Sequence, residues 1–130
     1  MAEAVMIPPS SGNREQAGGS VLIIDDESSI RESLEALLDA DGYSVYSAAS
    51  GEEGLARLAE QPVDAVLLDF ALPDRNGLDI LSDIRDRHAA LPVIMITAYG
   101  TLENAVAAMR GGASNFIQKP WDNEKLLADL

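Results

Sequence analysis

The sequence predicts an α/β fold, in which a doubly wound five-stranded parallel sheet carries helices on both faces. The first observation is that five short apolar runs alternate with segments whose apolar residues recur at helical spacing. The second is that glycine and proline residues separate these segments. The third is that three of the five runs are apolar throughout, as strands buried on both faces are. Strands and helices that alternate in this way form a parallel sheet between two helical layers.

The expected strands can be sorted by their polarity. They comprise residues 21–24, 43–48, 65–68, 93–96 and 115–118. The first, third and fourth are unbroken apolar runs, so we place them in the centre of the sheet. The second and fifth mix polar and apolar residues, as edge strands do. This sorting gives the flavodoxin-like order 2-1-3-4-5, in which the switch point lies between the first and third strands.

The segments between the strands are expected to be helices that turn their apolar residues to the core. The clearest apolar stripes are Ile30, Leu34, Leu37 and Leu38; Leu78, Leu81 and Ile84; and Leu102, Ala105, Val106 and Met109. A last helix follows Trp121 and carries Leu126, Leu127 and Leu130. Because it reaches residue 130 without a capping signal, we expect the chain to continue into an output domain in a longer protein.

The ends of the chain and its charge restrict the function further. Residues 1–19 are rich in Pro, Gly, Ser and Gln and are expected to form a flexible tail before a single domain at 20–130. Nine basic residues against 22 acidic ones give a net charge of −13, which disfavours direct binding to nucleic acid. With no apolar run long enough for a membrane span, no secretory signal and no cysteine, we expect a cytoplasmic protein.

Three aspartates follow neighbouring central strands of the predicted sheet. Asp25 and Asp26 end the first strand, and Asp69 ends the third. At about 5 Å, two carboxylates repel by roughly 3 kcal/mol at a surface-like dielectric, which a divalent cation would relieve. Mg²⁺ prefers such oxygen ligands. The plainer interpretation is that acidic residues here, or Ser28 or Ser29, only cap the following helix; the convergence of three carboxylates favours the cation site.

Thr97 and Lys119 follow the fourth and fifth strands at the same edge. Either residue alone would be routine, as a strand threonine or a surface lysine. The chain has only two lysines, however, and this one is expected beside the aspartates. An ammonium group and a hydroxyl group suit phosphoryl oxygens, and an aspartate can form an acyl phosphate. The sequence therefore points to phosphoryl chemistry at this edge.

These segments resemble the signature segments of response-regulator receiver domains. The resemblance covers residues 20–130 and all five β/α units in order. It rests on VLIIDDE (21–27), LLDFALP (67–73), NGL (76–78), ITA (96–98) and FIQKP (116–120). The segments around Thr97 and Lys119 look most like receivers of NtrC-type activators, which carry an AAA+ ATPase and a DNA-binding domain.

The resemblance implies a phospho-acceptor and a metal site. Asp69 would accept a phosphoryl group from a sensor histidine kinase. Mg²⁺, with Mn²⁺ as a substitute, would be held by Asp26, Asp69 and the backbone carbonyl of Ala71, with Asp25 contributing through water. The domain would catalyse only its own phosphotransfer and slow dephosphorylation, and so would be a regulatory domain and no enzyme in the ordinary sense.

The resemblance also implies a switch. Lys119, Thr97 and the Ala98 backbone N–H would contact the phosphoryl group, and the Lys119–Pro120 peptide bond would be cis. On phosphorylation Thr97 would move towards the phosphoryl group and Phe116 would turn inward. The surface formed by the fourth helix, fifth strand and fifth helix would then change its partners, and a homodimer could form through it.

Three other functions share part of this pattern. An aspartyl phosphohydrolase that uses Mg²⁺ generally needs a second Asp two residues after the nucleophile, where this chain has Ala71. A flavodoxin-like nucleotide binder would need a glycine- or hydroxyl-rich first turn, where this chain has an acidic one at 25–29. A receiver-like interaction module that takes no phosphate stays open as the alternative, because sequence cannot measure phosphorylation.

Overall fold

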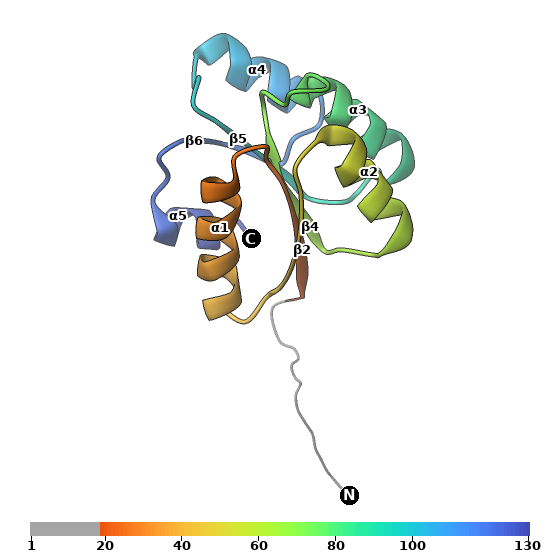
Figure 1. Cartoon of the computed structure of the whole chain (residues 1–130). Helices are drawn as coiled ribbons and strands as arrows, with labels where there is room; N and C mark the ends of the chain where they lie inside the picture. Colours follow the sequence, from red (N-terminus) through yellow and green to blue (C-terminus); the bar gives the residue numbers. More distant parts are fainter. Residues whose placement is uncertain (1–18) are drawn as a thin grey trace, which may run out of the picture.

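The computed structural model describes residues 19–130 and contains the predicted parallel sheet. The tail expected at 1–19 lies outside the described residues, except for Gly19. All the strands pair in parallel, in the order β3-β2-β4-β5-β6 (Figure 1). Their bounds are β2 Ser20–Ile24, β3 Ser44–Ala48, β4 Ala65–Asp69, β5 Val93–Thr97 and β6 Asn115–Gln118. The order 2-1-3-4-5 is therefore confirmed, with β3 and β6 at the edges.

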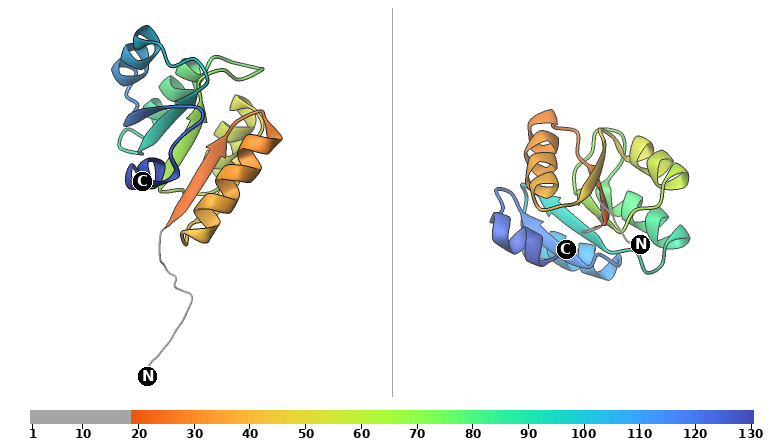
Figure 2. Two further views of the ribbon diagram at one scale, coloured as in Figure 1. Left: turned by 90° about the vertical axis from the view of Figure 1, so that its left-hand side faces the viewer. Right: turned by 90° about the horizontal axis from the view of Figure 1, so that it is seen from below.

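Five helices within residues 19–130 cover the two faces of this sheet. They are α1 Ser28–Ala40, α2 Gly51–Glu60, α3 Gly77–Arg87, α4 Leu102–Arg110 and α5 Asn123–Ala128. Buried residues of α1 and α5 pack on one face, and those of α2, α3 and α4 pack on the other. Figure 2 shows α1 (orange) and α2 (yellow) on opposite sides of the sheet. The doubly wound arrangement predicted from the sequence is the observed one.

The central strands are apolar throughout because both of their faces are covered. In β2, Leu22 and Ile24 belong to the core on the α2–α4 side, whereas Val21 and Ile23 belong to the core on the α1–α5 side. Each of these four side chains is at most 1% exposed. Burial of such a side chain contributes about 1.5–3 kcal/mol, so the sheet holds both layers of helices in place.

Side-chain caps define where most of the helices begin. Ser50, Asn76, Thr101 and Asp122 each accept a hydrogen bond from a backbone N–H in the first turn of the following helix. Helix α1 differs, since its N-cap residue is Glu27 and no side chain caps it there. The alternative in which Ser28 or Ser29 caps α1 is therefore wrong, and the N-cap of α1 directly follows Asp25 and Asp26.

Helix α4 corrects an expectation. Its large apolar residues were predicted to face the core, but Leu102 is 81% exposed, Val106 40% and Met109 50%. The residue that α4 buries fully is Ala108, at 0% exposure. A small side chain at this contact lets the helix approach the sheet closely, and it leaves the larger apolar residues in solvent.

A search of residues 19–130 finds no helix long and apolar enough to cross a membrane.

Candidate functional site

The carboxyl ends of β2 and β4 bring three aspartates together. Ile24 pairs with Leu68 in the sheet, so Asp25 and Asp69 follow at the same level of adjacent strands. One carboxylate oxygen from each of Asp25, Asp26 and Asp69 lies within 4.8 Å of the others. Asp25 and Asp69 are buried, and Asp26 is exposed. Three oxygen donors at this spacing, one of them open to solvent, could hold a metal ion, and the donor set fits Mg²⁺.

Lys119 reaches the same cluster from the end of β6. Its Nζ lies 2.9 Å from Asp25 Oδ2, 3.6 Å from Asp69 Oδ2 and 3.5 Å from Glu27 Oε1. Burial of the ammonium group lowers the pKa of Lys119, but the hydrogen bond to Asp25 and the charge of Asp69 outweigh burial and raise the pKa overall. Lys119 therefore stays protonated and neutralises part of the acidic site.

The surroundings of Asp69 shift the pKa of its carboxyl group strongly. Burial and the neighbouring charge of Asp25 raise its pKa to about 6, against the opposing effects of Lys119 and the Ala71 amide. The single ammonium group thus does not offset the burial of two carboxylates. At neutral pH Asp69 is therefore mainly ionised. A further positive charge nearby would stabilise its carboxylate.

Backbone and side-chain hydrogen bonds fix the orientation of the buried aspartates. Asp69 Oδ1 accepts from the Ala71 N–H at 3.2 Å, and Asp25 Oδ1 accepts from the Glu27 N–H at 2.9 Å. Arg31 Nη1 donates to the backbone carbonyl of Asp25 at 2.7 Å. Since Oδ1 of Asp69 is engaged, its Oδ2 is the oxygen that faces Lys119.

Thr97 and Ala98 lie at the end of β5, next to β4. Thr97 is fully buried, and its Oγ1 accepts from the Tyr99 N–H at 2.9 Å, so the hydroxyl proton can be donated to another acceptor. Ala98 is exposed and lines, with Lys119 and Trp121, an open groove of about 630 Å³ beside α1. Asp69 pairs with Ile96 in the sheet, which puts Thr97 one position beyond the end of β4.

Phe116, the predicted switch aromatic, lies in β6 and is half-buried. Its ring meets that of Phe70 edge to face, with centroids 6.3 Å apart. Because Phe70 follows Asp69 directly, the chain just after β4 is in contact with the edge strand β6 at this point. The Lys119–Pro120 peptide bond is cis, as the resemblance implied.

Several residues around the site were not identified from the sequence. Glu27 lies 3.5 Å from Lys119, and Arg31 binds the Asp25 carbonyl. Asp74 accepts from the backbone N–H groups of Gly51 and Glu52. Arg31 could have been identified from the sequence, because it is the one basic residue of α1. Asp74 could not, because its hydrogen-bond partners lie 22 and 23 residues away.

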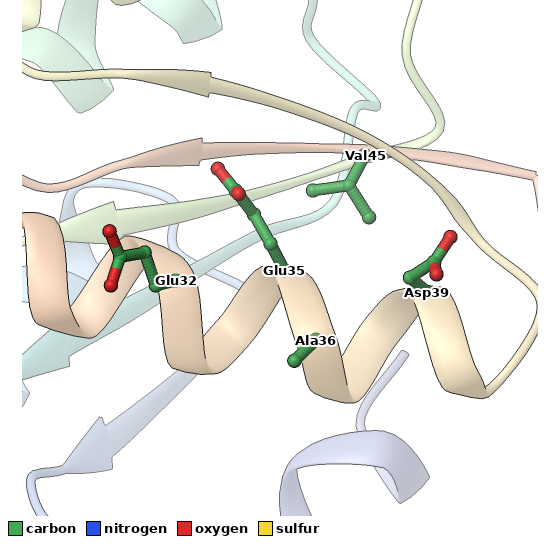
Figure 3. Close-up of a pocket in the computed structure, with 5 residues that line it drawn as sticks. All are labelled: Glu32, Glu35, Ala36, Asp39 and Val45. Atoms are coloured by element: carbon green, nitrogen blue, oxygen red, sulfur yellow. The ribbon is translucent and has the colours of Figure 1, made fainter.

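A second hollow lies apart from the predicted site residues. It is lined by Glu32, Glu35, Ala36 and Asp39 of α1 and by Val45 of β3, and Figure 3 shows the three carboxylates spaced along one side of the helix. No lysine or arginine lines it. This hollow therefore lacks a cationic side chain such as Lys119, which at the aspartate cluster could bind a phosphoryl oxygen.

Comparisons with known proteins identify a family for this chain. The model of the response regulator receiver domain family matches residues 21–130. The response regulator protein PilR of Pseudomonas aeruginosa is 45% identical over 105 residues, which are 81% of this chain and 24% of PilR. The transcriptional regulator NtrC of Salmonella typhimurium is 40% identical over 110 residues, which are 85% of this chain and 24% of NtrC. These two relatives confirm the resemblance to receivers of NtrC-type regulators.

A solved structure supports the same assignment. The CheY-like receiver domain protein of Methanospirillum hungatei superposes with a TM-score of 0.80 at 35% identity, over 84% of this chain and 87% of that one. The chain spans about a quarter of the length of the curated relatives it matches first. From the matching family model, these relatives and the fold, the chain belongs to the response regulator receiver domain family.

Proposed function

We propose that this domain is a phosphorylation-dependent switch in which Asp69 accepts a phosphoryl group from the phosphohistidine of a sensor kinase. The observation that carries the proposal is the ionised, buried Asp69 with Oδ1 held by the Ala71 amide and Oδ2 facing Lys119. Oδ2 would attack phosphorus and form the O–P bond. The N–P bond breaks, and its electron pair returns to the imidazole nitrogen of the kinase.

Asp26, Asp69 and the backbone carbonyl of Ala71 would hold a Mg²⁺ ion, with Asp25 contributing through water, and Mn²⁺ would serve as a substitute. The ion would offset the charge of the phosphoryl oxygens and of the carboxylates that approach them. The exposure of Asp26 supports this assignment, because a ligand open to solvent gives the ion a way in. Asp25, with one oxygen on the Glu27 amide and the other on Lys119, is held in a fixed orientation for a bridging water.

Lys119, Thr97 and the Ala98 N–H would bind the transferred group. The protonated Lys119 lies 3.6 Å from Asp69 Oδ2, the attacking oxygen. From there it can stabilise the negative charge that develops on the phosphoryl oxygens during transfer. The buried Thr97 can donate its hydroxyl proton. These residues would support only the domain's own phosphotransfer and slow dephosphorylation, which makes it a regulatory domain.

The phosphorylated site would act on the face formed by α4, β6 and α5. Thr97 would move towards the phosphoryl group and Phe116 would turn inward, changing which partners this face binds. The exposed Leu102, Val106 and Met109 support an interface on α4, including a homodimer. We also propose that residues 20–130 precede an output domain in a longer cytoplasmic regulator, and that any contact with DNA is made by that domain.

The test is intact mass after incubation with acetyl phosphate and Mg²⁺. Wild type should gain one phosphoryl group, Asp69→Asn none, and the control Asp86→Asn, which changes an exposed aspartate of α3, should behave as wild type. Chelation of the metal before the incubation should prevent formation of the adduct. An adduct that persists in Asp69→Asn would refute Asp69 as acceptor.

The alternative is a receiver-like interaction module that takes no phosphate. Absence of an adduct on wild type, both from acetyl phosphate and from a panel of phosphorylated sensor kinases, would favour it. An aspartyl phosphohydrolase is disfavoured by Ala71, which occupies the position where a second acid would be needed. Light scattering of the same samples tests the proposed dimer, which should form only with the adduct present.

A further inference from the structure

The loop that follows the acceptor strand is closed at its base. Ala71 and Asn76 form an antiparallel bridge, and the Gly77 N–H donates to the Phe70 carbonyl at 2.9 Å. The Ala71 N–H also holds Asp69 Oδ1. Any displacement of this loop would therefore move both Asp69 and the Ala71 carbonyl.

The tip of the same loop is fastened to helix α2 by Asp74. Its Oδ1 accepts from the Gly51 N–H and its Oδ2 from the Glu52 N–H, both at 3.0 Å. These are the first two amides of α2, and neither has a partner within the helix. Ser50, the N-cap, accepts from Glu53 instead. The carboxylate of Asp74 thus satisfies two donors that the cap leaves over, and these two amides hold its pKa below the usual range.

Gly51, whose N–H donates to Asp74, packs closely against Ile80 of α3. A Cβ at Gly51 would lie 2.5 Å from Ile80 Cδ1 and 3.5 Å from Asp74 Oδ1. The absence of a side chain at residue 51 lets the start of α2 come close to α3 and to the loop. The contact is therefore built into the packing of the two helices.

Arg75 ties the tip of the loop to the same two helices. Its Nη1 lies 2.7 Å from Asp83 Oδ2 in α3 and 3.0 Å from Glu52 Oε2 in α2. These ion pairs are partly exposed and add little to the free energy of unfolding. Their geometry nevertheless restricts the loop from a second direction, next to the bidentate contact of Asp74.

We propose that Asp74 is a positioning residue for the metal and phosphoryl site. Its two hydrogen bonds hold the Ala71–Asn76 loop against the first turn of α2. The inference rests on the proposed function of Asp69. Mg²⁺ tolerates little departure from octahedral geometry, so a ligand carbonyl on a loosened loop binds it less tightly. Asp74 touches neither the ion nor the phosphoryl group; its effect reaches them through the backbone.

The experiment measures Mn²⁺ binding by the electron paramagnetic resonance signal of the free ion, for wild type, Asp74→Ala, Asp74→Asn and the control Asp86→Ala. Loss of a residue that orients a metal site commonly weakens binding by about 10-fold or more, and since Asp74 acts through the loop we expect a rise in the Kd of about 3- to 10-fold for Asp74→Ala. Asp74→Asn keeps one acceptor oxygen and should lie in between. Asp86→Ala removes the same charge from α3 and should match wild type.

Two further readouts separate positioning from folding. Amide hydrogen exchange should become faster at Glu52 and at Ala71 in Asp74→Ala, at a temperature where circular dichroism shows it folded. The Mg²⁺ concentration that half-saturates labelling by acetyl phosphate should rise with the Kd, while the rate at saturating Mg²⁺ stays within about twofold, because the ligands themselves are intact.

The outcomes distinguish this proposal from the function on which it rests. Faster exchange at Glu52 with unchanged Mn²⁺ binding would show that Asp74 only caps α2, and would overturn the proposal. A weaker Mn²⁺ site in Asp74→Ala, with no adduct on wild type from acetyl phosphate or from the panel of phosphorylated kinases, would support the positioning role of Asp74 and contradict Asp69 as acceptor. Wild type that binds Mn²⁺ no better than Asp26→Asn would overturn both.

Discussion

The carboxyl group of Asp69 is ionised in surroundings that oppose its charge. Burial and Asp25 raise its pKa from 3.8 to about 6. A folded-state pKa above the unfolded value means that the folded protein binds the proton more tightly. Stability from this group is therefore present below pH 4 and is lost as the pH rises through about 6. Above that pH, the folded state retains a carboxylate that it would hold more favourably as a neutral group.

Asp69→Asn should accordingly raise the melting temperature in metal-free buffer at neutral pH. The pKa change corresponds to at most about 3 kcal/mol, and with the loss of the Lys119 contact and solvent screening we expect about 1–2 kcal/mol, or several degrees. The measurement is thermal unfolding followed by circular dichroism at pH 7.5 and pH 4. The difference should shrink at pH 4, where wild-type Asp69 is protonated. An unchanged or lower melting temperature at pH 7.5 would contradict the model of converging carboxylates.

Gly77 is a second residue on which the site depends, because it packs against the backbone of Asp69 and Phe70. A Cβ there would lie 2.5 Å from the Asp69 carbonyl oxygen and 2.7 Å from that of Phe70. Backbone atoms cannot yield as a flexible side chain can, so Gly77→Ala should lower the free energy of unfolding by about 1–3 kcal/mol. The matched control is Gly111→Ala, whose Cβ would meet Leu81 Cδ2 at 3.1 Å and whose φ of −75° suits alanine. It should stay within about 1 kcal/mol of wild type in urea unfolding; equal costs for the two variants would exclude a special role of Gly77.

Single residues also mark how far the sequence predicts the site. Asp25, Asp26, Asp69, Thr97 and Lys119 could be placed together, because the ends of parallel strands share one edge of a sheet. Glu27, Arg31 and Asp74 could not, since their roles depend on side-chain reach and on contacts between distant segments. Periodicity carries the first kind of information and not the second.

At the scale of elements, the same distinction explains the error at α4. Its apolar spacing predicts a helix, and a helix is present. The spacing does not say which face is buried, because Ala108 on one side competes with Leu102, Val106 and Met109 on the other. Ala108 packs in the core, and the larger residues remain in solvent on the face where we propose an interface.

The contact between Phe70 and Phe116 joins the chain just after β4 to the edge strand β6, and its strength can be measured. A double-mutant cycle with Phe70→Leu and Phe116→Leu should give a coupling of about 0.5–1.5 kcal/mol in the unphosphorylated protein, from urea unfolding. The control cycle pairs Phe70→Leu with Tyr99→Leu, because the Tyr99 side chain is 66% exposed, and should give a coupling near zero. A coupling near zero for both pairs would exclude a direct energetic link between Phe70 and Phe116.

At the scale of the whole molecule, the net charge of −13 opposes the compact state. Added salt screens this repulsion, since the Debye length falls from about 30 Å at 0.01 M to about 10 Å at 0.1 M. NaCl should therefore raise the melting temperature gradually, without saturation at the concentration of any one site. The gain should be similar in wild type and in Asp26→Asn, because one charge changes the total little.

Mg²⁺ should add a separate, saturable stabilisation on this background. An ion that binds only the folded state stabilises it by RT ln(1 + [L]/Kd), which grows logarithmically beyond the Kd. We expect the melting temperature of wild type to be higher in MgCl₂ than in NaCl of equal ionic strength. In Asp26→Asn this excess should disappear. The three carboxylates of Asp25, Asp26 and Asp69 lie close enough for such a site. If the excess survives in Asp26→Asn, the ion binds elsewhere, and the acidic side of α1 with Glu32, Glu35 and Asp39 becomes the place to test by substitution.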